Sequence, residues 1–490
     1  MIVHGFDKLN ISDGLLAFDT ETTGLNPYVR FPARPFIWSF CDSSFNKAYI
    51  RFDVDPFTRK IDYGTQGKQL VSQYLRDNTI TKIGYNFGFD HVMSCCAGIP
   101  VRGKFHDVLF LTHVVTGGSA LNYKLKFISK ALMGYPDDDE KLLERSVIER
   151  RKMGKALGWK IATPETHGKK YIKSDYWLAE ESIVAEYAMN DAERTMLLYL
   201  GLYPKVQKDS GMMKTYKREQ KLLFTIVNME RRGVRTFPEK IAEVEEYYSS
   251  IQKQQLKILA KEGLEDINIR SSVQKSQYFY EQKKYEAKYF TDKGNPSTDA
   301  DSLVYFWQKY KDISAKAMLE YTACAHMLSN FIAPYKQFLV KEPDGAIIHP
   351  SIKQVGTKTG RLSGEDPNMM QVADDNSGRK KSSIRLRIRE LFGPRKNCWW
   401  YLYDYSQIEI WVFNLLSGDK SLIEPLLLGE DIHTINTHKI FGKRKDFEQQ
   451  KERYRKITKQ VNFCKIYGGG VGKVALLLGC SVSEASEFID

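Results

Sequence analysis

The sequence predicts a multidomain protein that combines α/β and α+β architecture, and three observations lead to this prediction. The chain has 490 residues, enough for about three or four domains with ample hydrophobic core. The first two hundred residues contain short strand-like runs and amphipathic helical segments, whereas long helical stripes follow from about Lys214. Near the end, an apolar run typical of a buried strand precedes a helix closed by glycines.

The first candidate site lies in the run GLLAFDTETTGL, at residues 14–25. The run predicts a buried strand that ends in acidic residues and a glycine turn. Asp19 and Glu21 are two residues apart, so a strand places both on one face. Two carboxylates at a strand end form a hard, oxygen-rich site of the kind that binds Mg²⁺ or Mn²⁺. The alternative is a solvated strand end.

Two later segments carry further acids. KIGYNFGFDHVM, at 82–93, predicts a strand that leads into a turn or helix, where Asn86 and Asp90 share a face unless Asn86 is a helix cap. AEYAMNDAERTMLLYL, at 185–200, predicts an amphipathic helix with Tyr187 and Asp191 four residues apart. The alternative for Asp191 is an exposed acid on a surface helix.

The middle of the chain is predicted to be helical. The charged run PDDDEKLLERSVIERRKMGK, at 136–155, is interpreted as a surface insertion. From about Lys214, EQKLLFTIVNMERRGV and PEKIAEVEEYYSSIQKQQLKILAKEGL each carry an apolar stripe at helical spacing, and Phe237-Pro238 separates them. Most of these apolar residues are expected to be core.

The final stretch combines a predicted strand with a predicted helix. WWYLYDYSQIEIWVF, at 399–413, is an apolar run interrupted by Asp404, and an ionised carboxylate inside a buried strand is costly unless a positive group meets it. In RKITKQVNFCKIYGGG, at 455–470, two cations and two aromatic residues recur every four positions and form one helical stripe. Such a stripe suits a polyphosphate followed by a base and sugar, although a surface helix with a mixed face is the alternative. GGGVGK, at 468–473, does not fit a P-loop, because Tyr467 stands at the required first glycine.

The net charge and the cysteine content indicate what kind of partner and compartment the protein has. The formal net charge of +13 favours a polyanionic partner and salt-dependent binding, which a ribosomal or membrane-surface protein would also show. Seven scattered cysteines without a CxxC pair indicate reduced thiols in a cytosolic setting. No apolar signal segment and no membrane-spanning run are present, so a cytoplasmic location without membrane contact is expected.

Three motifs of the final stretch together resemble family A DNA polymerases, the DNA polymerase I type. They are DYSQIE at 404–409, DIH at 431–433 and the helix with Arg455, Lys459, Phe463 and Tyr467-Gly468, in matching order and approximate spacing. SQIE after the aspartate disfavours single-subunit RNA polymerases. The resemblance implies a palm strand on which Asp404 binds two Mg²⁺ (or Mn²⁺) ions, and a fingers helix that grips the incoming dNTP. The implied nucleotide-binding residues are Gln407, Glu409, His433, Arg455, Lys459, Phe463 and Tyr467.

Individual roles also follow from this resemblance. Arg455, Lys459 and His433 would contact the triphosphate, with arginine suited to a bidentate grip and lysine to a point charge. Phe463 would pack on the sugar and Tyr467 against the new base pair. Glu409 would close the pocket where a ribose 2′-OH would lie, unless it is a strand acid that faces solvent.

The acids of the first two hundred residues, taken in series, resemble the DEDDy type of 3′→5′ proofreading exonuclease domain that accompanies many family A polymerases. The matching residues are Asp19, Glu21, Asp90, Asp191 and Tyr187. The resemblance implies a ribonuclease H-like fold, a mixed sheet flanked by helices, with two divalent ions held by Asp19, Glu21 and Asp191 and with Asp90 acting through water. Two metals ~3.5–4 Å apart stabilise both the attacking and the leaving oxygen of phosphodiester hydrolysis. Tyr187 would orient the attacking water, since the pKa of a free tyrosine is about 10.

Contacts with primer-template DNA are implied by two further segments. HPSIKQVGTKTGRLSGEDPNMMQ, at 349–371, carries the family's TGRLS and DPN, with Arg361 near the primer terminus and Asn368 near the template. Met370 stands where many relatives carry a glutamine that reads the minor groove. RKKSSIRLRIR, at 379–389, has six cations and no acid, which favours phosphate contacts from Arg379, Lys380 and Lys381 over a solvated basic edge.

The resemblance divides the chain into four parts: an exonuclease domain at 1–205, a helical thumb at 206–345, the N-terminal part of the palm at 346–420 and part of the fingers at 421–490. A His-Asp-Glu turn with the second palm aspartate is expected but does not appear after SVSEASEFID. We therefore expect a split DNA-directed DNA polymerase completed by a second polypeptide that carries the rest of the palm and fingers. The alternatives are a stand-alone 3′→5′ exonuclease with an inactive polymerase region and a non-catalytic scaffold that binds primer-template. A proofreading domain without a 5′-nuclease suits a phage enzyme.

Overall fold

The computed structural model divides the chain into two compact units, one with the described residues up to 398 and one with those from 399 onward. It describes residues 1–29, 31–167, 171–291, 293–343, 345–357, 359–373, 382–418, 420–478 and 480–487. Arg379, Lys380 and Lys381, the predicted phosphate contacts, lie outside the described residues. Among the helices described, none is long and apolar enough to cross a membrane.

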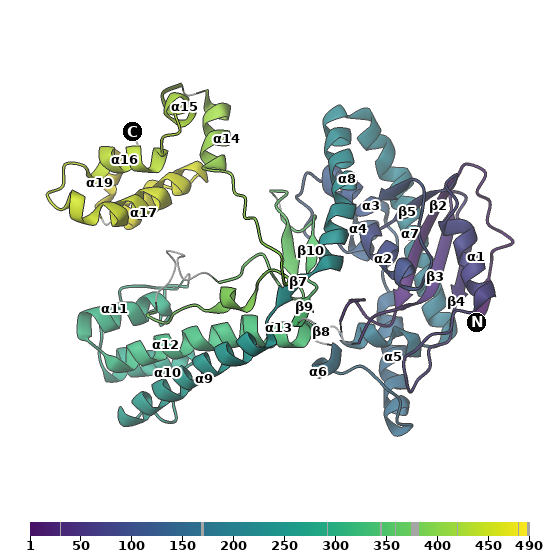
Figure 1. Cartoon of the computed structure of the whole chain (residues 1–490), viewed down its shortest axis with the longest axis horizontal. Helices are drawn as coiled ribbons and strands as arrows, with labels where there is room; N and C mark the ends of the chain where they lie inside the picture. Colours follow the sequence, from purple (N-terminus) through teal and green to yellow (C-terminus); the bar gives the residue numbers. More distant parts are fainter. Residues whose placement is uncertain are drawn as a thin grey trace. The chain divides into compact units, whose positions relative to one another are not determined.

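A six-stranded mixed sheet forms the core of the N-terminal region, with the strand order β1-β4-β3-β2-β5-β6 (Figure 1). β2 pairs antiparallel with β3 on one side and parallel with β5 on the other. The pairing buries all eight residues of PFIWSFCD in β3, which explains its continuous apolar pattern. The strands are β1 (Ile2–His4), β2 (Leu15–Thr22), β3 (Pro35–Asp42), β4 (Lys47–Arg51), β5 (Thr81–Gly84) and β6 (Phe105–Asp107).

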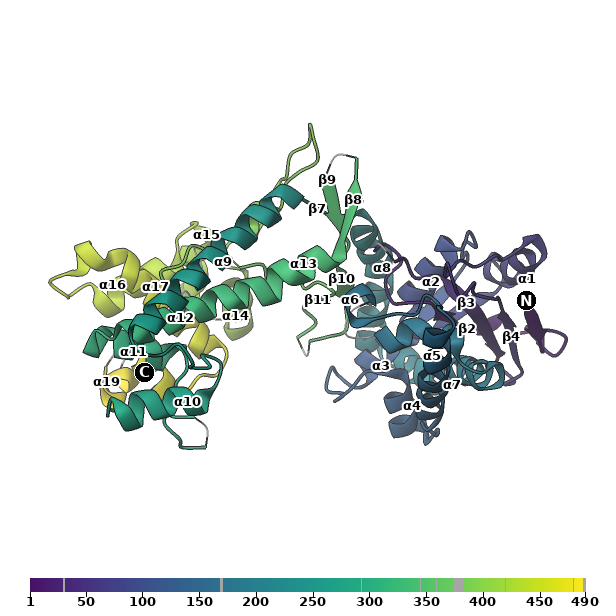
Figure 2. The same ribbon diagram turned by 90° about the horizontal axis from the view of Figure 1, so that it is seen from below.

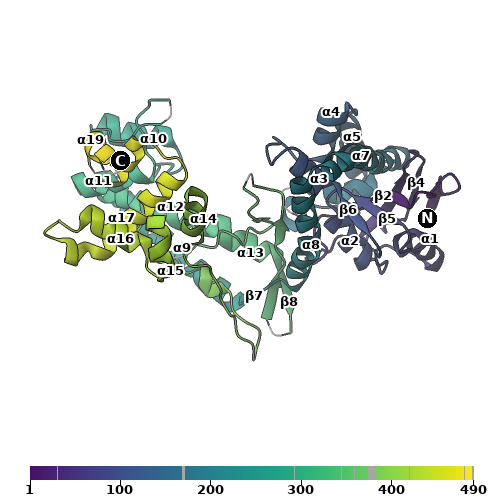
Figure 3. The same ribbon diagram turned by 90° about the horizontal axis from the view of Figure 1, so that it is seen from above.

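Helices cover both faces of this sheet, as expected from the resemblance, and the alternation along β3 shows which helix covers which face. The indole of Trp38 donates to Ser94 of α2, whereas the hydroxyl of the next residue, Ser39, donates to the carbonyl of Ala188 in α7. α2 and α7 therefore lie on opposite faces (Figure 3). The helices are α1 (Thr65–Leu75), α2 (Phe87–Cys96), α3 (Val108–Val115), α4 (Leu125–Met133), α5 (Asp139–Ala156), α6 (Pro164–His167), the 3₁₀ helix η1 (Tyr171–Leu178), α7 (Glu181–Lys208) and α8 (Ser210–Arg232).

The charged run at 136–155, interpreted as a surface insertion, also contributes to the core, because one face of the helix that it forms is buried. Its residues form α5, whose Leu143 and Val147 are fully buried against Tyr176, Val184 and Tyr187. The apolar positions are sparse among the charges, but they lie on one face of the helix, and that face packs against α7. α5 is therefore part of the N-terminal core.

The predicted helices after residue 214 are present. Phe237 is the N-cap and Pro238 the first residue of α9, which runs beside α12 (Figures 1 and 2). A three-stranded sheet, ordered β7-β9-β8, and a two-stranded sheet, β10-β11, lie in the same unit. The elements are β7 (Val234–Thr236), α9 (Pro238–Lys261), α10 (Ser272–Ser276), η2 (Gln277–Gln282), α11 (Ala300–Tyr310), α12 (Ile313–Met327), η3 (Leu328–Ile332), α13 (Ala333–Phe338), β8 (Leu339–Glu342), β9 (Gly345–Ile348), β10 (Ser351–Lys353), β11 (Ser363–Glu365) and η4 (Ile388–Leu391).

The second unit is helical, and the strand predicted at 399–413 was wrong. Trp399–Tyr405 forms neither strand nor helix, and its aromatic side chains are exposed, Tyr403 at 91%. A strand needs neighbours for its backbone hydrogen bonds, and none pairs with this segment among the described residues. The rest of the run begins α14. The helices are α14 (Ile408–Ser417), α15 (Lys420–Leu427), α16 (Ile432–Phe441), α17 (Phe447–Ile466), α18 (Val471–Leu478) and α19 (Val482–Glu487).

Candidate active and nucleotide-binding sites

Three carboxylates meet where β2 faces α7. Asp19 and Glu21 point to the same side of β2, and Asp191 comes from α7, so that one oxygen from each lies within 4.8 Å of the others. Glu21 and Asp191 are buried, at 7% and 8% exposure. The structure thus brings together three of the four acids that the sequence predicts for a metal site.

The fourth acid, Asp90, lies close by but is bound differently. Its carboxylate accepts hydrogen bonds from the backbone N–H of Thr20 at 2.9 Å and from the Thr20 hydroxyl at 2.6 Å. Thr20 alternates with Asp19 and Glu21 along β2, so its side chain points to the α2 face of the sheet. Asp90 therefore stands outside the group of three. Asn86 stands at the N-cap position of α2 with φ 64°, but its side chain accepts no capping hydrogen bond.

Burial and mutual repulsion raise the pKa of every acid in this place. Burial raises the pKa of Glu21 to about 8, and the charge of Asp191 adds to the effect. Burial, followed by the charge of Asp90, raises the pKa of Asp19 well above its usual range. Burial raises the pKa of Asp90 to about 7 although Thr20 opposes the shift. Such a group favours a bound cation.

Two cations that the sequence did not indicate lie against Asp191. The ammonium of Lys126, on α4, is 3.3 Å from Oδ1 of Asp191 and 3.2 Å from Oδ1 of Asp139, the first residue of α5. The guanidinium of Arg194 is 2.7 Å from Oδ1 of Asp191 and 2.7 Å from Oδ2 of Asp139. Arg194 follows Asp191 by three residues on α7, a spacing that signals contact. Nothing in the sequence pattern links Lys126 or Asp139 to the site.

Tyr187 is buried on α7 one turn before Asp191. The Lys126 ammonium lies 3.4 Å from the centre of its ring, and burial raises the pKa of its hydroxyl well above the usual range. A hollow of about 650 Å³ beside it is lined by Asp139, Leu142, Asn190 and Arg194, among others. The predicted tyrosine is therefore next to the acids and next to a space open to solvent.

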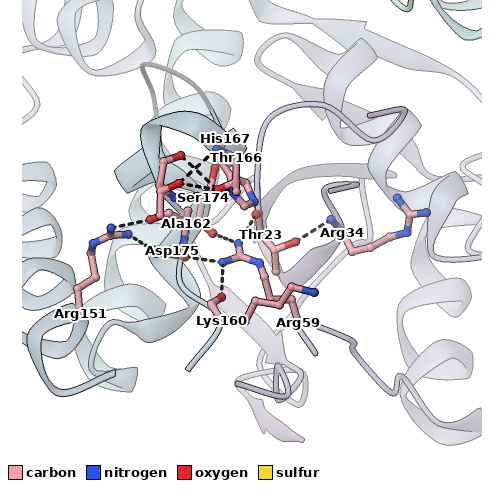
Figure 4. A network of polar contacts seen from close by, with 11 residues as sticks. Thr23, Arg34, Arg59, Arg151, Lys160, Ala162, Thr166, His167, Ser174 and Asp175 are labelled. Carbon is pink, nitrogen blue, oxygen red and sulfur yellow. Dashed lines mark hydrogen bonds and ion pairs between the residues drawn. The ribbon is translucent and has the colours of Figure 1, made fainter. Parts of the chain in front are cut away.

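A buried network fixes the end of β2 that carries Glu21 (Figure 4). Asp175 is fully buried and accepts from Arg59 Nη1 at 2.6 Å, from Arg151 and from the backbone N–H of Ala162 at 3.0 Å. Arg59 also donates from Nη2 to the carbonyl of Thr23 at 2.8 Å. Asp175 thereby links the segment after Glu21 to η1 and to α5.

In the second unit, α16 and α17 pack together (Figure 3). The predicted cations and aromatic residues lie on these two helices. Arg455 pairs with Asp431, the N-cap of α16, at 2.7 Å. The Lys459 ammonium lies 5.9 Å from the centre of the Phe463 ring, and that ring is 5.5 Å from the ring of His433. His433 is buried, which lowers its pKa, and its Nδ1 is 3.0 Å from the amide nitrogen of Asn462.

The start of α14 is tied to the same two helices. The hydroxyl of Tyr467, the C-cap of α17, donates to Oε1 of Glu409 at 2.8 Å. Gln407 accepts from the backbone N–H of Ile432 at 3.1 Å and donates to the carbonyl of Glu430 at 3.2 Å. Glu409 lies in the first turn of α14 and not on a strand as predicted. Five of the seven predicted nucleotide contacts thus lie on α14, α16 and α17, while Gln407 is the N-cap of α14 and Tyr467 the C-cap of α17.

Among the predicted palm and DNA contacts, the structure describes Asp404, Arg361 and Asn368. Asp404 is exposed within the irregular segment Trp399–Tyr405, so it is not the buried strand acid expected from the sequence. Arg361 is exposed, and Oδ1 of Asn368 accepts from the backbone N–H of Met370 at 3.0 Å. In the basic run, Ile384 and Ile388 are buried and Arg387 pairs with Glu243 and Glu390. In the described part of that run, Ile384 and Ile388 therefore belong to the core, whereas the Arg385 side chain is 69% exposed.

Comparison with known proteins places these features in a family. The sequence model of DNA polymerase family A matches residues 235–490. The chain is 30% identical over 243 residues to DNA polymerase I of Helicobacter pylori, which covers 49% of this chain and 25% of that protein. It is 24% identical over 500 residues to DNA polymerase I of Rhizobium leguminosarum, covering 97% of this chain and 45% of that protein. It is also 29% identical over 207 residues to the DNA polymerase of Bacillus phage SP01, covering 42% of this chain and 22% of that protein.

The chain therefore spans less than half the length of these curated relatives. Among solved structures, it is similar to the POL domain of Pol1 from M. smegmatis, which was solved in complex with DNA primer-template and dNTP. The TM-score is 0.71 at 17% sequence identity, and the match covers 97% of this chain and 71% of that one. This likeness establishes the fold.

Proposed function

Since this chain belongs to DNA polymerase family A, we propose that it acts in template-directed synthesis of DNA from deoxynucleoside triphosphates and also removes nucleotides from the 3′ end of DNA. The observation that carries the hydrolytic part is the group of three carboxylates formed by Asp19, Glu21 and Asp191. The synthetic part is supported by the family and by the face that α16 and α17 form together.

Divalent ions such as Mg²⁺ or Mn²⁺ fit the group of three, because all its ligand atoms are hard carboxylate oxygens. Burial disfavours the charged form of these carboxylates, and a bound cation would offset that cost. When bound, such ions activate water and stabilise charge on the leaving oxygen of a phosphodiester. Asp19, Glu21 and Asp191 hold the metal, and Asp90 acts through water from its place beside Thr20. Tyr187 orients the attacking water, since its raised pKa keeps its hydroxyl protonated.

The exonuclease proposal is tested on the purified whole chain with single-stranded DNA. We expect digestion from the 3′ end in Mg²⁺ or Mn²⁺ that EDTA stops. Asp19→Ala combined with Glu21→Ala should abolish digestion while Tm stays close to wild type, because two repelling buried carboxylates are removed. Asp53→Ala, at an exposed acid that pairs with the N-terminus, is the control and should digest normally. Undiminished digestion by the double variant would remove these residues from the site.

For synthesis, each residue has a role that its position supports. Arg455, Lys459 and His433 contact the triphosphate, with the guanidinium forming paired hydrogen bonds and the ammonium acting as a point charge. Phe463 packs on the sugar and Tyr467 against the new base pair. Glu409, hydrogen-bonded to Tyr467, closes the pocket where a 2′-OH would lie, and Gln407 holds the start of α14 against α16.

Asp404 is proposed as a palm ligand for the two metal ions of nucleotide transfer. Those ions need more than one carboxylate to fix their spacing. Among the described residues, Asp404 belongs to no group of three metal-binding side chains. We propose that a second polypeptide supplies the remaining palm carboxylate, and that such an assembly excludes water from the aromatic segment Trp399–Tyr405.

Primer-template contacts complete the proposal. Arg361 lies near the primer terminus, Asn368 near the template, and Arg379, Lys380 and Lys381 contact phosphates. The net charge of +13 supports a polyanionic ligand whose affinity falls with salt.

Nucleotide binding is tested by adding each dNTP to a complex of the Asp19→Ala chain with primer-template, which is not degraded. The dNTP complementary to the template should stabilise the complex, and Arg455→Ala should lose this effect. Lys456→Ala, at the exposed neighbour of Arg455 on α17, should keep it. Primer extension that vanishes in Asp404→Ala would support synthesis. A complex that forms without extension would favour the scaffold alternative, and an equal response to all four nucleotides would contradict the proposed pocket.

A further inference from the structure

Lys126 places a positive charge inside the acidic group of the proposed exonuclease site. Its ammonium is 3.3 Å from Oδ1 of Asp191, one of the three proposed metal ligands, and 3.2 Å from Asp139. It also lies 3.4 Å from the centre of the Tyr187 ring. The side chain is only 11% exposed, so the ammonium has been taken out of water and held by these three groups.

Arg194 forms a second ion pair with the same oxygen of Asp191. Its Nη1 lies 2.7 Å from Oδ1 of Asp191 and 2.7 Å from Oδ2 of Asp139, and its side chain is 1% exposed. The ammonium of Lys126 and the guanidinium of Arg194 thus both contact Oδ1 of Asp191, and Asp139 of α5 pairs with both cations. Since Lys126 and Arg194 both contact Oδ1, a divalent ion held with Asp19 and Glu21 would use the other oxygen of Asp191.

A second divalent ion would compete directly with this arrangement. The two ions of such a site would lie ~3.5–4 Å apart. With Oδ1 of Asp191 already in contact with an ammonium and a guanidinium, an ion on that side would meet two positive charges at short range and low exposure. The Lys126 ammonium already supplies positive charge at that position.

We propose that the exonuclease site binds one divalent ion, through Asp19, Glu21 and the second oxygen of Asp191, and that the ammonium of Lys126 takes the place of the other. This inference rests on the proposed exonuclease function and changes its metal requirement. It assigns Lys126 a role next to the scissile phosphate, and it explains why Asp139 of α5 reaches the site: Asp139 balances the added charge.

The test is the number of Mn²⁺ ions bound by the whole chain, measured by calorimetric titration in an Asp404→Ala background. We expect one ion per chain in the parent and two in Lys126→Met, which keeps the packing on Tyr187 and removes the charge. Lys126→Arg, which keeps the charge, should bind one. Lys130→Met, on the same helix at a lysine that is 60% exposed and paired with Asp137, should also bind one.

Digestion of single-stranded DNA gives a second measurement. Its dependence on Mg²⁺ should follow a Hill slope near one in the parent and near two in Lys126→Met, with Tm measured for each variant. Two ions in the parent, or one in a folded Lys126→Met, would overturn the inference while leaving the exonuclease proposal intact. If the parent bound no Mn²⁺, or if its Mn²⁺ binding and its digestion were both unchanged by Asp19→Ala with Glu21→Ala, both the inference and the exonuclease proposal would be overturned.

Discussion

Arg455 of α17 donates from Nε to Oδ2 of Asp431 at 2.7 Å, and Nη2 of the same guanidinium lies 2.7 Å from that oxygen. Asp431 in turn caps α16, where it accepts from the backbone N–H of His433 at 3.2 Å and from the Thr434 hydroxyl at 2.7 Å. Burial alone would raise the pKa of Asp431, but the hydrogen bonds from Thr434 and Arg455 lower it. The cation proposed for the triphosphate is thus already paired, and a triphosphate must compete with Asp431 for it.

Asp431→Asn should therefore tighten dNTP binding. The amide keeps an acceptor for the cap of α16 but removes the charge that competes with the phosphates. A half-exposed ion pair is worth about 0.5–1 kcal/mol, so we expect a Kd lower by about two- to fivefold in titrations with primer-template present. Arg455→Ala should raise Kd in the same assay. A Kd that rises in Asp431→Asn would show that Asp431 orients Arg455 more than it competes.

Glu409→Ala should weaken discrimination against ribonucleoside triphosphates. The carboxylate is hydrogen-bonded to the Tyr467 hydroxyl at 2.8 Å, and its proposed role is to fill the space of a 2′-OH. Removing it opens that space, and we expect the ratio of Kd values for the matching rNTP and dNTP to fall at least about tenfold, which is about 1.4 kcal/mol. Tyr467→Phe keeps the carboxylate and should change the ratio much less. An unchanged ratio in Glu409→Ala would contradict the role.

Asp175→Asn should destabilise the N-terminal region strongly. The carboxylate is fully buried and pairs with Arg59 and Arg151, so its loss leaves two guanidinium groups without a compensating charge (Figure 4). Breaking a buried pair in this way costs about 3–5 kcal/mol. Urea unfolding followed by circular dichroism measures the change, and digestion should fall too because Arg59 holds the carbonyl of Thr23. Asp53→Asn, in an exposed pair, should change stability by less than about 0.5 kcal/mol.

Glu230→Gln should make stability less dependent on pH. Burial raises the pKa of Glu230, on α8, from 4.5 to about 7, and its Oε1 accepts from the backbone N–H of Ile352 at 2.5 Å. Because the folded pKa is the higher one, the folded chain binds the proton more tightly, and the resulting stability is present below about pH 4.5 and lost as the pH rises to about 7. Glutamine keeps the acceptor without the charge.

At pH 8 the free energy of unfolding of Glu230→Gln should therefore exceed that of wild type by about 1–2 kcal/mol, after allowance for partial exposure. Near pH 4.5 the two free energies should be equal. Thermal unfolding at both pH values measures the difference. Glu246→Gln, at an exposed residue of α9, is the control and should show no pH-dependent gain. An equal gain for Glu230→Gln at both pH values would mean that the charge does not matter.

Local periodicity accounts for what the sequence could predict of the exonuclease site. A strand alternates its side chains, so Asp19 and Glu21 had to share a face, and a helix brings Tyr187 and Asp191 together. Lys126 and Asp139 could not be found in this way. They reach Asp191 only because α4 and α5 pack against α7, a tertiary contact that no spacing in the sequence encodes.

In the second unit, the sequence predicted a strand that the structure does not contain among its described residues. The apolar run at 399–413 was predicted as a buried strand from its composition, but a strand also needs pairing partners, and nothing within the run shows whether they are present. The structure places Trp399–Tyr405 outside regular structure and Ile408–Ser417 in α14. The stripe on α17 was found because four-residue spacing is a property of the helix itself. The roles of Asp404, Arg361 and Asn368 remain predictions.

Chymotrypsin should cleave the chain first between Trp399 and Tyr405. Proteases need an exposed segment without regular structure, and this one joins the two compact units and offers several aromatic side chains with high exposure, including Tyr403 at 91%. The N-terminal product should be a stable fragment of about 400 residues that still digests DNA from the 3′ end, because the group of three carboxylates and its network lie entirely within the first unit. Mass spectrometry of a time course identifies the first cut, and replacing Trp399, Trp400, Tyr401, Leu402, Tyr403 and Tyr405 by serine should slow it. First cleavage within α9 or α12, or a product without exonuclease activity, would show that the two units depend on each other.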